Sequence, residues 1–246
     1  MKPGTIAIRE PLPVTRWKPI LRDAELFGDL PETLLDYILQ HAQERALRDK
    51  DLLYLKHSPN EFVAIVLQGF IHTLHTSADG RELISGRFGP GALVGETAFI
   101  DDDVRSASAI AYGETRTLVL AKRHFPFLLA EPVFLLHITR LLAHRLKQST
   151  HLIESMCLNN LEARLALYFL SIIDQQLPAN TPNVTRDILV PMPPTQGILA
   201  AMINVSRPKL NAQLRSWQKA GLITLKNDHL QLNDLPQLRL KARTTM

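Results

Sequence analysis

The side chains with the clearest capacity to recognise another molecule lie near the C-terminus. One predicted helix there is rich in cationic and amide side chains. Five of them are expected on its exposed face: Arg207, Lys209, Asn211, Gln213 and Arg215. Such side chains donate to phosphate oxygens and to the edges of DNA bases. The pattern therefore predicts contact with DNA.

Two helices joined by a tight turn would position these groups. A first helix is indicated by apolar residues at helical spacing, namely Ile198, Leu199, Met202 and Ile203. Asn204 tolerates the left-handed conformation that ends a helix, and Val205 can be buried in the turn. The tract is typical of a helix-turn-helix, although an ordinary helical hairpin with a solvated charged face is the alternative.

The start of the second helix has its own signals. Ser206 is a favoured N-cap residue, and Pro208 fits the first turn of a helix. Leu210, Leu214 and Trp217 lie three and four residues apart and form the predicted buried stripe.

The distribution of charge agrees with binding to phosphates. The chain carries a formal charge of +4. The residues from 180 onward include nine Lys or Arg and only three Asp. The positive excess is thus concentrated in the segment with the predicted helix-turn-helix, as DNA binding requires.

A second group of candidate residues lies between residues 89 and 107. Gly89, Gly91 and Gly95 fall in a short tract that ends with Glu96, and Arg105 follows nine residues later. A glycine-rich turn exposes backbone N–H groups to an anion, and an arginine can neutralise it with paired hydrogen bonds. A carboxylate beside that arginine suits ribose hydroxyls, so the tract indicates an anion or nucleotide site.

Composition limits the class of protein. A chain of 246 residues with 46% hydrophobic and 21% charged residues is ordinary for a folded protein and long enough for two domains. Cys157 is the single cysteine, so neither an internal disulfide nor a cysteine-ligated cluster is possible. The first twenty residues lack the apolar core of a signal peptide. No stretch of the sequence has enough consecutive apolar residues to span a membrane. We expect a cytoplasmic protein that requires no cofactor.

The first half of the chain changes from helical to strand-like patterns. Residues 1–22 are expected to be an irregular arm, and Leu34, Leu35, Ile38 and Leu39 indicate a helix. Strands are predicted at residues 63–67, 70–75 and 116–120, with hairpin turns at Gln68-Gly69 and Asp79-Gly80. Repeated short strands predict a small barrel or double-sheet roll.

The second half begins with a long helix, predicted at residues 131–158. Leu135, Leu142, Ser149 and Met156 recur every seven residues, with Leu146 and Ile153 between them. This seam favours dimerisation through a coiled coil, and a helix lying on its own domain is the alternative. Asn159 or Asn160 is expected to cap the next helix, and residues 177–183 to form a surface loop. Residues 221–225 and 229–232 are expected to form a β-hairpin wing.

Together these motifs resemble the Crp/Fnr family of bacterial transcription regulators. The resemblance covers residues 24 to 235 and depends on the order of four features: a roll with Gly-Glu-Thr-Ala and Arg-Ser-Ala, a long helix, the pattern Thr-Gln-x-x-Leu-Ala-x-x-x-x-Val-Ser-Arg, and a wing. It implies an α+β fold: an N-terminal cyclic-nucleotide-binding-like β-roll over residues 23–130, a dimerisation helix over 131–158, and a winged helix-turn-helix domain over 159–246.

The resemblance also implies an effector site, with cyclic AMP or a similar nucleotide as the effector. Gly95 and Glu96 would contact the ribose, Thr97 and Ala98 would offer backbone N–H groups to the cyclic phosphate, and Arg105 with Ser106 would bind that phosphate. Ser149 and Thr150 match a hydroxyl pair that contacts adenine from both subunits. A serine in the apolar seam costs stability that a bond to such a ligand would offset.

The recognition helix departs from that of the cyclic-AMP-binding members. Arg207 is retained and is expected to pair with guanine, but Pro208 and Ala212 replace a carboxylate and a second arginine, so the operator should differ. Lys209 and Asn211 are expected to make other contacts, with Gln196, Ser206 and Arg215 on phosphates. His72 and His75 are interpreted as ordinary surface or packed residues rather than haem ligands.

The leading hypothesis is a homodimeric regulator in which an effector shifts the population of DNA-binding states, on a palindromic operator and with RNA polymerase as a partner. One alternative is a regulator of the same type that senses another signal or none. Another is a nucleotide-binding module whose winged helix contacts proteins. An enzyme is not expected, because the chain shows no nucleophile–base set, metal cluster or Walker loop.

Overall fold

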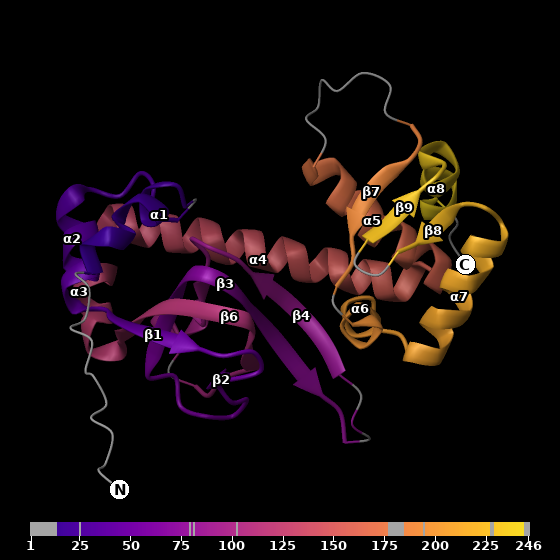
Figure 1. The fold of residues 1–246 in the computed structure, drawn as a ribbon. Coiled ribbons are helices and arrows are strands. Elements are labelled where there is room, and N and C mark those ends of the chain that lie inside the picture. The colour runs from indigo at the N-terminus through magenta and orange to yellow at the C-terminus, as the bar shows by residue number, and fades with distance from the viewer. Residues whose placement is uncertain are drawn as a thin grey trace, which may run out of the picture. The chain divides into compact units, whose positions relative to one another are not determined.

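The computed structural model describes residues 14–24, 26–78, 80, 82–101, 103–176, 185–193, 195–226 and 229–243. The chain separates into two compact units (Figure 1). One comprises residues 1–73 and 86–145, and the other residues 74–85 and 146–246. Each unit has its own hydrophobic core, and each is described separately below.

Short helices precede the N-terminal sheet, most of which belongs to the first unit: η1 (Val14–Trp17), α1 (Lys18–Arg22) and α2 (Glu32–His41). The sheet has six strands, β1 (Gln43–Leu47), β2 (Leu52–Tyr54), β3 (Phe62–Thr76), β4 (Glu82–Phe88), β5 (Leu93–Val94) and β6 (Ser108–Ala121). Its order is β1-β6-β3-β4, with β2 paired to β6 and β5 to β3. The predicted β-rich N-terminal domain is confirmed.

The turn predicted at Gln68-Gly69 is wrong, because β3 runs unbroken through it. Gly69 has a φ of +75°, and a Cβ at this position would come within 2.9 Å of the Thr115 Cα on β6. The glycine therefore allows a close approach between two long strands rather than a chain reversal. The second predicted hairpin lies where expected, since β3 and β4 flank Gly80 and are hydrogen-bonded neighbours. Asp79 lies outside the described residues.

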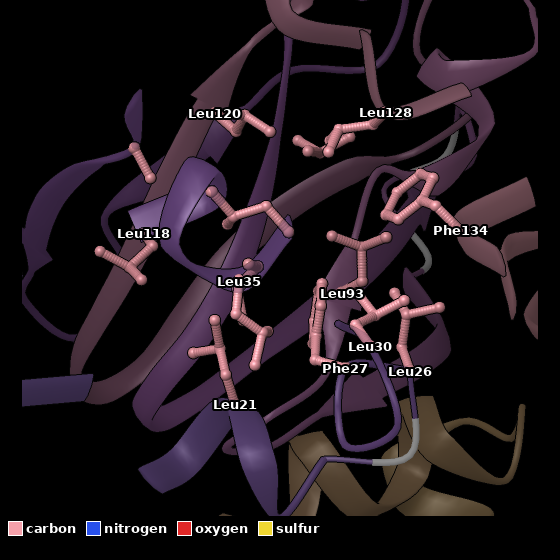
Figure 2. Packing of buried hydrophobic residues seen from close by; sticks show 14 of the residues in the cluster. Leu21, Leu26, Phe27, Leu30, Leu35, Leu93, Leu118, Leu120, Leu128 and Phe134 are labelled. Atoms are coloured by element: carbon pink, nitrogen blue, oxygen red, sulfur yellow. The ribbon is translucent and has the colours of Figure 1, made fainter. Parts of the chain in front are cut away.

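The helices of the first unit cover the sheet with apolar side chains (Figure 2). Leu21 of α1, Leu35 of α2 and Leu93 of β5 are almost fully buried in one cluster. Leu118 and Leu120 of β6 join it, as do side chains from α3 (Phe125–Leu129) and from the first turn of α4 (Pro132–Leu158). The four apolar residues predicted for α2 are all buried. This core holds the strands that carry the candidate effector site.

The N-terminal arm differs from expectation over the part that the structure describes. Residues 1–13 lie outside the described residues, but Val14–Arg22 is helical rather than irregular. Leu21 is fully buried, and the Glu44 carboxylate accepts hydrogen bonds from Arg16 (2.8 Å) and from the Trp17 indole (3.1 Å). Pro19 lies at the start of α1, where a proline is tolerated. Within the described part of the arm, Pro19 thus begins a helix rather than preventing one.

The long helix α4 matches the predicted range to within one residue. Phe134 and Ile138 of its first half are buried in the first core. Three residues of the predicted seam, Leu135, Leu146 and Ile153, are 43%, 69% and 62% exposed. Among the described residues, no single helix has the length and apolar composition to cross a membrane. One pair of helical segments, Lys122–Leu129 and α4, has the required length and composition together, but the two are bent by 109° relative to each other.

The second unit contains the predicted helix-turn-helix and wing. Its elements are α5 (Leu161–Gln176), β7 (Ile188–Pro191), α6 (Gln196–Met202), α7 (Arg207–Lys219), β8 (Ile223–Leu225), β9 (His229–Leu232) and α8 (Leu235–Ala242). The Asn160 side chain accepts from the Ala163 N–H at 2.9 Å, so the predicted cap of α5 is confirmed. Strand β7, which was not predicted, pairs with β9 to make the wing a three-stranded sheet. The predicted loop at 177–183 lies outside the described residues.

Candidate effector pocket and nucleic-acid interface

A glycine-rich turn leads from β4 to β5 and on to the short helix η2 (Glu96–Phe99). Gly91 and Gly95 both have a φ of +82°, a conformation that side chains rarely adopt. A Cβ on Gly95 would collide with the guanidinium of Arg105. Gly95 is therefore required twice, for its backbone angle and for the approach of Arg105.

Arg105 is buried in the wall of this turn and is only 2% exposed. Its guanidinium donates to the carbonyls of Phe62 and Gly95 and lies 4.1 Å from the centre of the Tyr54 ring. The Phe62 ring is 4.9 Å away, so two aromatic faces stabilise the cation. Burial lowers the pKa of Arg105, while Tyr54 and Glu96 act in the opposite direction.

No carboxylate among the described residues lies within salt-bridge distance of Arg105. The Nε atom of Arg105 is buried and has no hydrogen-bond partner among the described residues. An arginine remains charged at neutral pH, and a buried charge is costly unless it is paired. The position is chemically suited to an anion.

Glu96 faces a second arginine, which the sequence interpretation did not assign to the site. Arg145 of α4 places its Nε atom 3.6 Å from a Glu96 oxygen, and its guanidinium lies 4.3 Å from the centre of the Phe88 ring. Arg145 also donates to the Leu93 carbonyl at 3.4 Å. Its position four residues before Ser149, on the same side of a helix, was the available signal.

The other residues expected at the phosphate differ in how accessible they are. Thr97 and Ser106 are exposed. Ala98 is buried, and its N–H already donates to the Gly95 carbonyl at 3.1 Å. In this structure the expected Ala98 donor is therefore occupied within the turn, because η2 closes a hydrogen bond of its own.

The expected adenine contacts lie further along α4. Ser149 and Thr150 are both exposed, and they belong to the part of α4 that the second unit contains. The Thr150 hydroxyl donates to the Leu146 carbonyl one turn earlier, at 3.0 Å. Their role toward a ligand remains a prediction.

The helix-turn-helix has the local geometry that its residues predicted. Asn204 adopts a φ of 51°, and Arg164 of α5 donates to the carbonyls of Ile203 (3.1 Å) and Asn204 (3.2 Å). Arg164 thus satisfies carbonyls at the end of α6 and braces the turn. Ser206 occupies the N-cap position of α7, but its side chain makes no capping hydrogen bond, contrary to expectation.

Most of the candidate DNA-contacting side chains are accessible. Ser206, Arg207, Lys209 and Arg215 are exposed, whereas Gln196 is half-buried. Asn211 is also half-buried, and its side-chain oxygen is covered without a hydrogen-bond partner among the described residues. Leu210, Leu214 and Trp217 form the inner stripe of α7, as predicted.

The two histidines of β3 differ in their surroundings. His72 is buried and stacks on Tyr112, with ring centres 4.8 Å apart, while His75 is half-buried. In the described part of the chain, no group of three or more His, Cys, Asp or Glu is arranged to hold a metal ion.

Comparison with known proteins identifies both units. Residues 44–131 match the family model of the cyclic nucleotide-binding domain, and residues 163–240 match that of the Crp-like helix-turn-helix domain. The chain belongs to the Crp/Fnr family of transcription regulators. Crp/Fnr regulators are not enzymes, and they bind DNA as dimers.

Individual Crp/Fnr relatives are distant in sequence. The chain is 22% identical over 227 residues to the CRP-like cAMP-activated global transcriptional regulator of Mycobacterium tuberculosis, covering 91% of this chain and 99% of the relative. It is 25% identical over 158 residues to the cyclic AMP receptor protein of Thermus thermophilus, covering 64% and 73% respectively. The c-di-GMP responsive global regulator CLP of Xanthomonas campestris has a similar fold, with a TM-score of 0.70 at 18% identity and coverage of 82% and 98%.

Proposed function

We propose that this Crp/Fnr regulator is a homodimer that binds a palindromic DNA operator and is controlled by a cyclic nucleotide, with cyclic AMP as the first candidate. Gly95, Glu96, Thr97, Ala98, Arg105 and Ser106 would hold the ribose and cyclic phosphate. Its action on transcription implies contact with RNA polymerase, and its DNA target implies a place in the bacterial cytoplasm.

The observation that carries the nucleotide proposal is the buried cation of Arg105. The guanidinium lies against the glycine-rich turn, and no carboxylate of the described residues, Glu96 included, lies within salt-bridge distance of it. A cyclic phosphate would supply that negative charge and accept from Arg105, while Glu96 would accept from a ribose hydroxyl.

The Glu96–Arg145 ion pair links this candidate site to α4. A ribose hydroxyl that bonds to Glu96 would compete with Arg145 for the same carboxylate. Binding would then alter the packing of α4 close to the seam residues, Leu142 and Leu146. This is a physical route from the effector to the dimer helix, and hence a means to shift the population of DNA-binding states.

The exposed seam of α4 supports the dimer. Leu146 and Ile153 present large apolar surfaces at heptad spacing, which a second copy of α4 would bury. In such a dimer Ser149 and Thr150 would contact adenine from both subunits. The two α7 helices would then reach successive major grooves about 34 Å apart.

The exposed residues of α7 support reading of the major groove. Arg207 would pair with guanine, and Ser206, Lys209 and Arg215 would contact phosphates or further bases. Gln196, at the first turn of α6, would contact a phosphate. Asn211 has to expose its covered oxygen before both ends of its amide can bond to an adenine.

The decisive experiment is calorimetric titration of the full-length protein with cyclic AMP, cyclic GMP and adenosine 5′-monophosphate. We expect Arg105→Ala to weaken cyclic AMP binding by about 10- to 100-fold, because a charge-assisted hydrogen bond contributes about 1.5–3 kcal/mol. Arg48→Ala, which removes an exposed arginine just after β1, is the control and should bind normally. If the wild type binds none of the three nucleotides, the nucleotide proposal is wrong.

A pair of glycine variants distinguishes damage to the nucleotide site from the effect of backbone strain alone. Gly95 and Gly113 have φ angles of +82° and +69°, but a Cβ on Gly113 meets nothing within 4 Å. Gly113→Ala should lose about 1–2 kcal/mol of stability in urea denaturation, because the left-handed region is unfavourable for alanine. Gly95→Ala should lose more, because its methyl group also collides with the Arg105 guanidinium. Only Gly95→Ala should also lose affinity for the nucleotide, since its methyl group displaces Arg105. Equal affinity of the two variants for the nucleotide would contradict the proposed binding site at Gly95 and Arg105.

A regulator that responds to another signal is the second candidate. This candidate is favoured because two groups expected to bind the nucleotide already have partners within the protein. Glu96 is paired with Arg145, and the Ala98 N–H donates to the Gly95 carbonyl. The c-di-GMP responsive relative shows that a similar fold accompanies a different effector. Nucleotide-independent binding to an operator would support this candidate. If the protein binds no DNA, a protein-contacting winged helix becomes the better hypothesis.

A further inference from the structure

The N-terminus of α5 carries a carboxylate that joins three helices of the DNA-binding unit. Glu162 lies in the first turn of α5, and its side chain is 29% exposed. One oxygen, Oε1, accepts from the Trp217 indole N–H at 2.8 Å and from the Lys241 ammonium at 2.7 Å. The same oxygen accepts from the Gln213 amide at 3.4 Å.

These donors come from two helices that are distant in sequence. Trp217 and Gln213 are one turn apart on α7, the predicted recognition helix, whereas Lys241 lies on α8 at the end of the chain. Trp217 is only 1% exposed, so its N–H needs an internal acceptor. Glu162 therefore ties α7 and α8 to the same point on α5.

The carboxylate is charged under ordinary conditions. Burial raises the pKa of Glu162, but hydrogen bonds from Lys241 and Trp217 and the Lys241 charge outweigh that effect, so the pKa lies below its usual value. The N-terminal end of α5 also favours a negative charge. A charged acceptor makes stronger hydrogen bonds than a neutral one.

Directional bonds restrict a motion that apolar packing permits. Leu210 and Leu214 hold α7 against the core, but such contacts change little when a helix rotates slightly about its own axis. A hydrogen bond weakens steeply as its angle changes, so the Trp217–Glu162 bond resists that rotation. Arg207 and Arg215 lie on the exposed side of the same helix and would move with it.

We infer that Glu162 is a positioning residue for DNA recognition, which sets the rotation of α7 through Trp217 and Gln213 and is itself held by Lys241. This inference rests on the proposed reading of DNA by α7, but not on any effector. Glu162 acts without touching a base. Its loss should therefore reduce discrimination between DNA sequences more than it reduces the salt-dependent attraction to phosphates.

The test uses the full-length protein and a DNA duplex selected by the wild type from a random-sequence pool. Affinity for the selected duplex and for a scrambled duplex of equal length is measured by fluorescence anisotropy at several salt concentrations. We expect Glu162→Leu to lower the ratio of the two affinities at least about tenfold. The salt dependence of binding to the scrambled duplex should not change, because the phosphate contacts are kept.

Three further variants separate positioning from folding. Glu162→Gln keeps an acceptor for Trp217 and should retain intermediate discrimination. Asp174→Asn removes an exposed charge from the same helix and should behave as the wild type. Ile173→Ala opens a cavity in the core of α5 and provides a matched loss of stability, measured by urea denaturation, without touching the Glu162 contacts.

The possible outcomes are distinct. Loss of discrimination in Glu162→Leu but not in Ile173→Ala supports the inference. Equal losses in these two variants, or full discrimination in Glu162→Leu, would overturn it. If the wild type selects no sequence at all, the proposed operator recognition fails instead, which is a separate result.

Discussion

At the scale of single residues, the structure explains why several side chains lie where they do. Arg105 needs Gly95 because a Cβ would occupy the space of its guanidinium, and Arg105 needs aromatic neighbours because few polar groups surround it. Glu96 and Arg145, which are far apart in sequence, satisfy each other. Such pairings follow from the fold and cannot be read from residue spacing.

His72 makes a prediction about the effect of pH. Its Nε2 atom is buried without a hydrogen-bond partner among the described residues, and burial, followed by the charge of Arg87, lowers the pKa of His72 to about 4. In the unfolded chain the pKa is near 6.5, so between about pH 6.5 and 4 the unfolded state binds the extra proton. The contribution of His72 to stability is therefore fully present above pH 6.5 and is lost as the pH falls toward 4.

The measurement is urea denaturation of the wild type and His72→Phe between pH 7.5 and 4. The wild type should lose up to about 3 kcal/mol more than the variant over this range, since each unit of pKa shift corresponds to about 1.36 kcal/mol. Phe preserves the ring contact with Tyr112 but cannot bind a proton. Parallel pH profiles for the two proteins would show that His72 is not the responsible group.

At the scale of elements, α4 shows how one helix serves two purposes. Its buried side carries Phe134 and Ile138, and its exposed seam carries Leu135, Leu146 and Ile153. Because 3.6 residues make one turn, these two sets occupy neighbouring strips along the same helix. The heptad pattern indicated the seam, while burial of the first half was decided by contacts with the β-rich unit.

A matched pair of substitutions tests the seam. Leu146 is 69% exposed on the seam, whereas Leu136 is 49% exposed but lies about 100° around the helix from Leu135. Leu146→Glu should convert a dimer into a monomer at micromolar concentration, because a coiled coil does not accept a buried carboxylate at this position. Leu136→Glu should remain dimeric. Light scattering after size-exclusion chromatography measures the mass, and a dimeric Leu146→Glu variant would place the interface elsewhere.

At the scale of the whole molecule, the proposed function depends on two-fold symmetry. A dimer presents two copies of α7, so an operator should contain two half-sites one helical turn apart. Five of the six polar residues expected at DNA lie between Ser206 and Arg215, and the sixth, Gln196, begins α6. Four of the six are exposed, whereas Gln196 and Asn211 are half-buried. The bases recognised should differ from those of cyclic-AMP-binding members, because Pro208 and Ala212 offer no hydrogen-bonding side chain.

Changing the spacing of the half-sites tests this symmetry. Inserting five base pairs between the half-sites of a selected operator places them on opposite faces of the duplex. Affinity measured by gel shift should then fall to that of a single half-site, while substitution of the central bases without insertion should have a smaller effect. Binding that tolerates the insertion would indicate independent recognition by each subunit.

The sequence by itself determined the local features of this protein. The apolar period of α2, the Asn204 turn, the start of α7 near Pro208 and the Asn160 cap all depend on residues within one or two helical turns of each other. The same applies to the glycine-rich turn and to the heptad seam. The family resemblance extended these local motifs to the order of the domains. The local signals for α8, namely the Asp234 cap and Pro236, were also present, although no helix was predicted there.

Only the tertiary structure decided which distant residues meet. It joined residues 63–67 and 70–75 into one strand, because Gly69 lets β3 approach β6 closely. It turned the expected irregular segment Val14–Arg22 into packed helices, since burial of Leu21 and bonds to Glu44 offset the cost of ordering the chain. It also brought Arg145 to Glu96, and Trp217 and Lys241 to Glu162. Contacts of this kind depend on how whole elements pack, and the spacing of residues along a chain carries no record of that packing.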